Sequence, residues 1–280
     1  MKLTFVLWMR VFLFIKEAEA CMDFTNEIKI FEDYIKNNYD FDNKLIKQKY
    51  IHTLNVVKVT LMLCEKLGLS KDGIVLAFYL ALFHDLGRFR EVVRQNEFNN
   101  LKFDHGAYSN KILFNDGFIN NFKIDEKDYS LIKKAVYFHN KKDLIDNLTD
   151  RERLFCEMLR DADRIDIFRV LAERKERTII FDGVSDEKLL RQFYTDKSID
   201  IKDLRTKGDR VLLRLSFIKL FSFQESSEVL KELGYFDEYL STIEVSEEHK
   251  ELFNELITEI NKVLEGEKKY VREKVRPFNG

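Results

Sequence analysis

The sequence predicts an all-α fold, and three of its features lead to this prediction. The 280 residues include one proline and ten glycines, so residues that break helices are few. Apolar residues recur at helical spacing along most of the chain, whereas few segments show the alternation expected of half-buried strands. Several of the helical patterns are bounded by capping residues or by glycine. We therefore expect a helical bundle that is followed by a helical C-terminal extension.

The composition is that of a globular protein, with 45% apolar and 34% charged residues. A net charge of −2 argues against general binding to nucleic acids or other polyanions. The three cysteines, Cys21, Cys64 and Cys156, are odd in number and far apart in the sequence. Buried thiols in a reducing compartment are the simplest interpretation, so we expect a cytoplasmic protein.

The first 21 residues form a segment of their own. Residues 1–15 are largely apolar, and Ala18-Glu19-Ala20 resembles the cleavage site of a signal peptide. However, Arg10 interrupts the apolar run, which is also short for a membrane span. We interpret residues 1–21 as an N-terminal extension, with a signal peptide or a membrane contact as the alternative. The rest of the sequence contains no candidate membrane span.

Residues 22–175 contain most of the strong helical patterns. Ser70 and Asp104 are expected to cap two of the helices. Gly68 is expected to follow the end of the helix before Ser70, and Gly87 the end of the helix that Ser70 caps. The helix around His52 carries apolar residues on two nearly opposite sides, so we expect it to be central and its histidine to point inwards. The expected helices span residues 24–37, 44–67, 70–86, 104–114, 125–140 and 150–175, with a polar connector over residues 91–102.

Residues 176–280 are expected to form a helical subdomain packed on the first domain, residues 22–175. Predicted helices lie over residues 211–223, 225–233 and 247–274, and residues 178–181 are expected to be extended. Gly234 would end the second of these helices. The basic residues from Lys268 to Arg276 are interpreted as a solvated helix end.

His84 and Asp85 are the most informative pair in the chain. They follow an apolar run over residues 74–83, and Gly87 and Arg88 come next. Burying two ionisable groups at the end of an apolar helix is unfavourable unless something compensates for it. A divalent metal ion would do so, because neutral imidazole and carboxylate are good ligands for such ions. The alternative is an ordinary capped and hydrogen-bonded helix end.

Four further residues occupy comparable positions on other predicted helices: His52, His105, His139 and Asp163. Taken singly, each histidine is explained as a core residue or as a residue near a helix end. The charged neighbours of Asp163 could form an ordinary surface lattice of ion pairs: Arg160, Asp161, Arg164 and Asp166. Taken together, the residues indicate a metal site, because helical bundles build such sites from side chains on facing helices.

The ordered pattern resembles the HD-domain superfamily of metal-dependent phosphohydrolases. The stretch from His84 to Arg88 is similar to the HDxGK/R motif of that family, and the Asp-Ala-Asp-Arg run over residues 161–164 is similar to its closing segment. The resemblance covers about residues 24–175. It implies an HD-domain helical bundle in which His105 and His139 hold a second metal. The first metal would be held by His52, His84, Asp85 and Asp163, with Asp85 bridging the two.

The resemblance also implies a function, which is hydrolysis of a phosphomonoester, phosphodiester or nucleotide by a metal-bound hydroxide at a dinuclear site. Asp85 and Arg88 would be the catalytic residues, with Arg88 contacting a phosphate oxygen. Lys141 and Lys142 are weaker candidates for the same contact. The cofactors would be two divalent metal ions, with Mn, Fe, Mg, Co, Ni and Zn not distinguished. The partner would be a small phosphorylated substrate, and the oligomeric state is not predicted.

The sequence leaves two other functions open. Some relatives with the same six ligands are mixed-valence di-iron oxygenases, such as the inositol oxygenase type. A non-catalytic HD module that binds a ligand is the other alternative, although all six ligand types are present here. The chain lacks the Gly-Tyr-Pro signature of the cyclic-dinucleotide phosphodiesterase branch, which argues against that branch.

Overall fold

The computed structural model describes residues 22–95, 103–173 and 179–267. Within these residues the chain is mainly helical and has two strands of three residues each, so the predicted all-α fold is confirmed. No helix of these three segments is both long and apolar enough to cross a membrane. The predictions for residues 1–21, 96–102, 174–178 and 268–280 lie outside the described residues.

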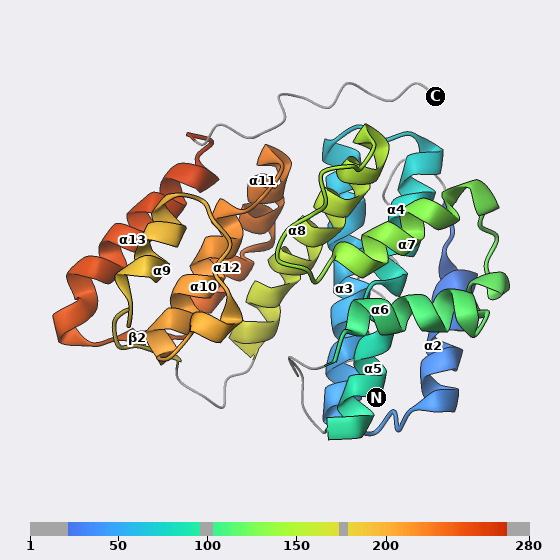
Figure 1. The fold of residues 1–280 in the computed structure, drawn as a ribbon, viewed down its shortest axis with the longest axis horizontal. Coiled ribbons are helices and arrows are strands. Elements are labelled where there is room, and N and C mark those ends of the chain that lie inside the picture. Colours follow the sequence, from blue (N-terminus) through green and yellow to red (C-terminus); the bar gives the residue numbers. More distant parts are fainter. Residues whose placement is uncertain (1–21, 96–102, 174–178, 268–280) are drawn as a thin grey trace. The chain divides into compact units, whose positions relative to one another are not determined.

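The chain divides into two compact units, and the boundary falls within one continuous helix, between Ala162 and Asp163. In the first unit α3 contacts α4 and α5, and α6 contacts α5 and α7 (Figure 1). The helices up to and including the boundary helix are α2 (Thr25–Asn38), α3 (Lys44–Lys66), α4 (Lys71–Phe83), α5 (Leu86–Gln95), α6 (His105–Asn110), α7 (Tyr129–Phe138) and α8 (Asp150–Glu173). The functional division predicted after residue 175 stays a prediction.

Helix α3 is the central helix of the first unit, as its two apolar sides predicted. The Asn43 side chain caps its start by accepting a hydrogen bond from the Leu45 amide at 2.8 Å. Leu54 on one side and Val56 on the other are both almost fully buried. His52 lies one turn before Val56 on the same side and is 3% exposed, so the prediction that it points inwards is confirmed.

The end of α4 differs from the prediction. Ser70 caps its start as expected, but the helix ends at Phe83, and Gly87 lies in the first turn of the next helix, α5, which extends to Gln95. The predicted connector is therefore helical over residues 91–95. Leu86, Phe89 and Val92 are almost fully buried, and this spacing of apolar residues explains why α5 continues into the polar stretch.

Gly87 has a packing role that differs from the expected role at a helix end. A Cβ atom at this position would lie 2.3 Å from the carbonyl oxygen of His105. The Gly87 amide donates to Ser109 Oγ at 2.8 Å, and Ser109 Oγ donates to the His84 carbonyl at 3.0 Å. The missing side chain thus lets α5 and α6 approach closely, which brings His105 towards the turn that carries His84.

The elements between α6 and α8 follow the prediction with local changes. The Asp104 side chain caps α6 by accepting from the Ala107 amide at 3.1 Å. The predicted helix to residue 114 continues as a π-helical turn, Lys111–Asn115, and Gly117 follows with φ of 76°. Short 3₁₀ turns lie at Phe118–Asn121 and Glu126–Asp128, and the predicted helix from residue 125 becomes regular as α7 only at Tyr129.

The second unit combines helices with one small parallel sheet, which pairs Ile179 with Ile243 and Phe181 with Val245. The helix predicted to start at residue 211 starts at Lys207, because Thr206 and Asp209 form a capping box. The helix predicted to reach residue 274 ends at Leu264, and Gly266 follows with φ of 87°. The elements are β1 (Ile179–Phe181), α9 (Glu187–Tyr194), α10 (Lys207–Lys219), α11 (Gln224–Leu233), α12 (Tyr235–Leu240), β2 (Ile243–Val245), a 3₁₀ turn (Ile201–Asp203), a second (Glu247–His249) and α13 (Lys250–Leu264).

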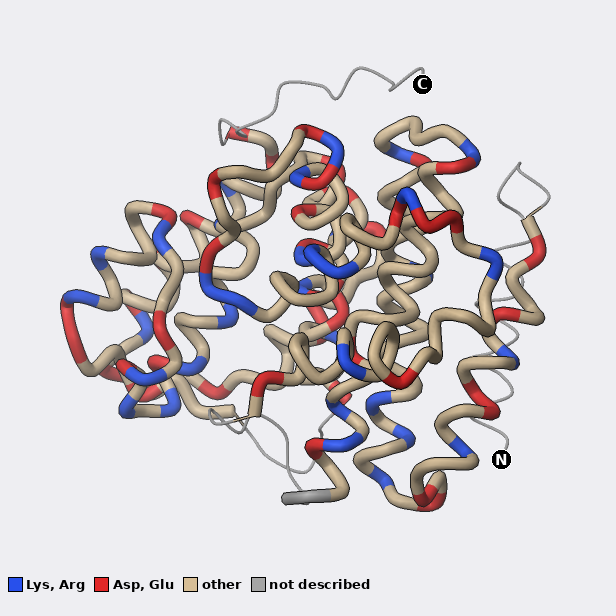
Figure 2. The backbone as a smooth tube through the Cα atoms, turned by 45° about the vertical axis from the view of Figure 1, so that its right-hand side comes forward, with Lys and Arg blue, Asp and Glu red and all other residues tan. Residues whose placement is uncertain are grey.

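Charged residues of both signs are interspersed along the described chain in Figure 2. This distribution fits the net charge of −2. Function therefore has to be sought in a local cluster of side chains.

Candidate metal centre

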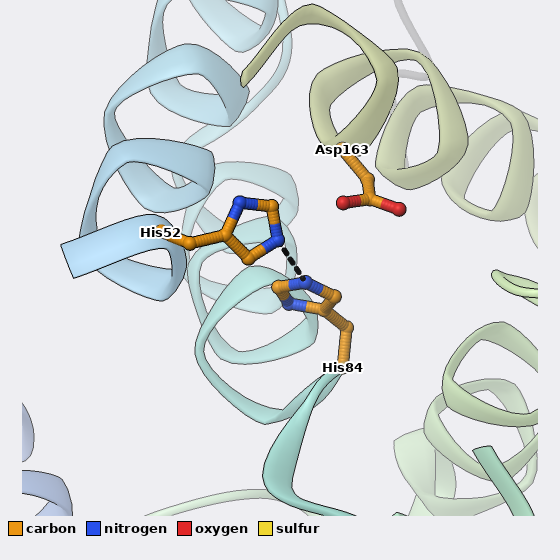
Figure 3. Close-up of side chains that lie close together, drawn as sticks. All are labelled: His52, His84 and Asp163. Atoms are coloured by element: carbon orange, nitrogen blue, oxygen red, sulfur yellow. Dashed lines mark hydrogen bonds between the residues drawn. The ribbon is translucent and has the colours of Figure 1, made fainter. Parts of the chain in front are cut away.

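The described structure brings the six predicted ligands together in two groups. His52, His84 and Asp163 form one group, and Asp85, His105 and His139 form the other. Within each group, one possible ligand atom from each residue lies within 4.8 Å of those of the other two. Figure 3 shows the first group, with His52 on α3, His84 at the end of α4 and Asp163 on α8. Its two histidines face each other through their Nε2 atoms, which are 3.4 Å apart.

Asp85 lies between four imidazoles and directs one carboxylate oxygen to each pair. Its Oδ2 is 3.5 Å from Nε2 of His52 and 3.5 Å from Nε2 of His84. Its Oδ1 is 3.6 Å from Nε2 of His105 and 3.4 Å from Nε2 of His139. This is the arrangement that a bridging carboxylate requires, because each oxygen can serve a different ion.

The local backbone orients two of the imidazoles. His84 follows α4, and its Nδ1 lies 2.7 Å from the Ala81 carbonyl oxygen. His139 follows α7 in the same way, and its Nδ1 lies 2.7 Å from the Val136 carbonyl oxygen. A carbonyl can only accept, so Nδ1 of each ring donates and Nε2 keeps its lone pair. Both Nε2 atoms are therefore prepared to bind a metal ion.

The charges around the cluster favour the same protonation states. Burial alone would raise the pKa of the Asp85 carboxyl, but the Lys49 ammonium holds that pKa well below its usual range. Burial lowers the pKa of His105 well below its usual range, and the Arg88 guanidinium lowers it further. Near neutral pH Asp85 is ionised and His105 is neutral, which are the forms that bind metals.

The hydrogen bonding of one carboxylate oxygen shows whether these residues fit a metal ion. Among the residues that the structure describes, Asp85 Oδ1 is buried and has no hydrogen-bond partner. An ionised carboxylate oxygen without a partner is costly in a protein interior. A divalent ion between Oδ1, His105 and His139 would satisfy it with ligand types common to first-row metals. The donor set therefore fits the group that the sequence implied.

The comparison with protein families agrees with this geometry. Residues 50–169 match the family model of the HD domain. This segment is an HD domain. It contains all six residues of the two groups, so the resemblance drawn from the sequence is confirmed. No curated protein and no solved structure matched the chain.

Arg88 lies at the edge of the HD-domain cluster. Its Nε is 3.7 Å from Asp85 Oδ1, and its Nη1 makes an ion pair with Glu91 Oε2 at 2.7 Å. Glu91 is fully buried, which fixes the guanidinium beside the centre. The predicted contact between Arg88 and a phosphate stays a prediction, and this position is compatible with it.

Lys49 is a cluster residue that the sequence analysis missed. Its Nζ pairs with Asp85 Oδ2, and its side chain is 14% exposed. The signal was its position on α3, three residues before His52, because residues three apart lie on the same face of a helix. Such a lysine is ordinary on a surface helix, and only the fold reveals its partner 36 residues away.

The charged neighbours of Asp163 do not form the surface lattice that was considered. Arg160, Asp161 and Asp166 are all buried. Arg160 donates to the carbonyl oxygens of Phe138, Lys141 and Lys142 at 2.7–2.9 Å. This arginine thus holds the segment on both sides of His139, a role that helix periodicity alone does not predict.

The two weaker phosphate candidates follow His139. Lys141 Nζ pairs with Asp104 Oδ2 at 2.5 Å, and its side chain lies over the Tyr137 ring, 4.5 Å from the centroid. These contacts involve residues outside the two ligand groups. The structure therefore gives Lys141 a contact that joins α6 to the end of α7, and the phosphate contacts of Lys141 and Lys142 stay predictions.

Proposed function

We propose that this protein is a metal-dependent phosphohydrolase that acts on a small phosphate ester or nucleotide. The observation that carries the proposal is the position of Asp85, whose two oxygens face two separate pairs of imidazoles. The HD domain over residues 50–169 supports it, because that family consists largely of metal-dependent phosphohydrolases.

The proposed roles of the residues follow from the two groups. His52, His84, Asp85 and Asp163 would hold one ion, and Asp85, His105 and His139 would hold the other. Two divalent ions bound in this way would supply Lewis acidity and lower the pKa of the attacking water. Arg88, fixed by Glu91, would orient the substrate by donating to a phosphate oxygen.

The proposed cellular setting and domain organisation rest on separate observations. Cys64 and Cys156 are free and buried, as expected for thiols in a reducing compartment, which supports a cytoplasmic location. We assign the chemistry to a domain over residues 22–175. Residues 176–280 would form a helical subdomain, with residues 1–21 as an N-terminal extension.

Metal analysis combined with a substrate panel tests the proposed function. The purified protein is stripped of metal, reloaded separately with Mn²⁺, Co²⁺ and Zn²⁺, and analysed for metal content. Release of phosphate or alcohol is then measured with aryl phosphates, phosphodiesters and nucleotides. The proposal predicts metal-dependent hydrolysis of at least one substrate. Metal-loaded protein that hydrolyses no member of the panel, but binds one, would favour the non-catalytic alternative.

A further inference from the structure

Two protein cations flank Asp85 from opposite ends of its carboxylate. Lys49 Nζ pairs with Oδ2, and Arg88 Nε lies 3.7 Å from Oδ1. The two side chains are only 14% and 16% exposed, and that of Asp85 is 3% exposed. Burying cations is costly, so their shared position at one carboxylate needs an explanation.

The two cations reach the cluster from different helices. Lys49 comes from α3, one turn before His52, and Arg88 comes from α5, one turn after Asp85. Both nevertheless reach the same carboxylate, that of Asp85. They therefore converge on the group that contains Asp85, His105 and His139.

One donor of this pair makes no hydrogen bond among the described residues, although it lies within ion-pair distance of Asp85 Oδ1. Nη1 of Arg88 pairs with the Glu91 carboxylate, whereas Nε of Arg88 is buried and makes no hydrogen bond. A buried guanidinium N–H without an acceptor is unfavourable and would gain from an anionic oxygen nearby. The ammonium of Lys49 is a compact charge on a flexible stem, so it can follow an oxygen over a short distance.

The balance of charge indicates how much negative charge a ligand should bring. The carboxylates at the centre are Asp85, Asp163 and the Glu91 partner of Arg88. With divalent ions on Asp85 and Asp163, and with Lys49 and Arg88 beside them, the positive charge of the centre would exceed its negative charge. A phosphomonoester brings about 1.5 to 2 negative charges at neutral pH. A phosphodiester brings about one and exposes fewer free oxygens.

Building on the proposed function, we propose that Lys49 and Arg88 form a two-cation clamp that selects a terminal phosphate over a phosphodiester. In the corresponding reaction, a water oxygen bonds to phosphorus and the ester P–O bond breaks. The alcohol leaves with a proton, and inorganic phosphate is the other product. Lys49 and Arg88 are positioned to contact the non-bridging oxygens, which a diester presents in smaller number and with less charge.

Equilibrium binding tests the clamp without relying on turnover. The probes are phenylphosphonate, which neither water nor the enzyme can split by ester hydrolysis, and its monomethyl ester. Titration calorimetry on Mn²⁺-loaded protein at about pH 8 measures the affinity for each probe. At this pH phenylphosphonate is mainly a dianion and its monomethyl ester is a monoanion. We expect the wild type to bind phenylphosphonate at least about tenfold more tightly, the factor given by one charge-assisted contact. Lys49→Met and Arg88→Met should each remove most of this preference.

Lys47→Met is the matched control, because Lys47 lies on the same helix but is exposed and pairs with Asp42 at 3.0 Å. It should keep the wild-type preference. Metal content is measured for every variant, so that lost binding is not confused with lost metal. If Lys49→Met fails to fold, Arg88→Met alone tests loss of a cation, and the charge-preserving Lys49→Arg should keep most of the preference. Equal binding of the two probes by the wild type, or an unchanged preference in both Met variants, would overturn the clamp.

Turnover separates this proposal from the proposed function. Hydrolysis of phenyl phosphate in preference to methyl phenyl phosphate supports both. Faster hydrolysis of the diester leaves the phosphohydrolase assignment intact and contradicts the clamp. If neither ester nor any other phosphate substrate is hydrolysed, the proposed function fails, while the binding preference still decides whether the two cations select a dianion.

Discussion

Replacing Asp85 should disturb both metal positions at once. Its two oxygens lie 3.4–3.6 Å from four imidazoles, two on each side. Asp85→Ala therefore takes one charged ligand from each ion. A charge-assisted contact is worth about 1.5–3 kcal/mol, so each ion should bind about tenfold to more than a hundredfold more weakly. No single histidine replacement should have this double effect, because each histidine belongs to one group.

The assay is metal content after dialysis against a weak chelator, with activity measured in parallel. We expect wild-type protein to retain two ions, Asp85→Ala and the isosteric Asp85→Asn to retain few, and both variants to be inactive. Circular dichroism should show that the helical fold survives. Asp116→Ala is the control, because this carboxylate is exposed and pairs only with Lys111 among the contacts described. Wild-type metal content in both Asp85 variants would refute the bridging role.

Three further changes test other parts of the centre. His105→Ala combined with His139→Ala should lower the metal content from two ions towards one, because both residues belong to the same group; a wild type that saturates with one ion would contradict this. Arg88→Ala should keep the metal and lower kcat/KM by about tenfold to a few hundredfold, with partial recovery in Arg88→Lys; unchanged kinetics would make Arg88 a structural cation. Gly87→Ala should destabilise the fold by about 1–3 kcal/mol, measured by thermal or urea unfolding, because the new Cβ would lie 2.3 Å from the His105 carbonyl oxygen. Gly73→Ala, where the nearest atoms are 3.4 Å away, should be neutral or stabilising, so equal effects of the two changes would contradict the packing role.

The sequence was most informative where a local rule decides the structure. Capping residues such as Ser70 and Asp104 start helices where they were expected to do so. The two apolar sides of α3 correctly indicated a buried central helix. The all-α fold follows from the same helical periodicity. These features depend on neighbours within a few residues, so the order of amino acids reveals them.

Other features depend on contacts between distant segments. Gly87 looked like the end of a helix, yet its role is to accept the close approach of His105 on α6. Lys49 was missed, because its partner Asp85 lies 36 residues further along. Helices α9 and α12 were not predicted, since they are short and their apolar patterns offer few repeats to recognise.

The candidate site shows both kinds of residue. The six ligand positions were predicted by resemblance to a family, and the structure brings them together in two groups. The surrounding groups that hold the site were not predicted. Arg160, for example, looked like part of a surface ion-pair lattice but is buried against three backbone carbonyls beside His139. Sequence periodicity places a residue on a helix face but does not identify the loop that covers it.

The most direct test of the central claim separates hydrolysis from oxygenation at the same ligands. A phosphohydrolase needs only Lewis-acidic ions, whereas an oxygenase needs iron and must consume O₂. One phosphate substrate is incubated with Mn²⁺-loaded protein in an anaerobic chamber and with iron-loaded protein in air. A phosphohydrolase should release inorganic phosphate with Mn²⁺ in the absence of oxygen. Turnover that occurs only with iron and is accompanied by O₂ consumption would contradict the phosphohydrolase assignment in favour of the oxygenase alternative.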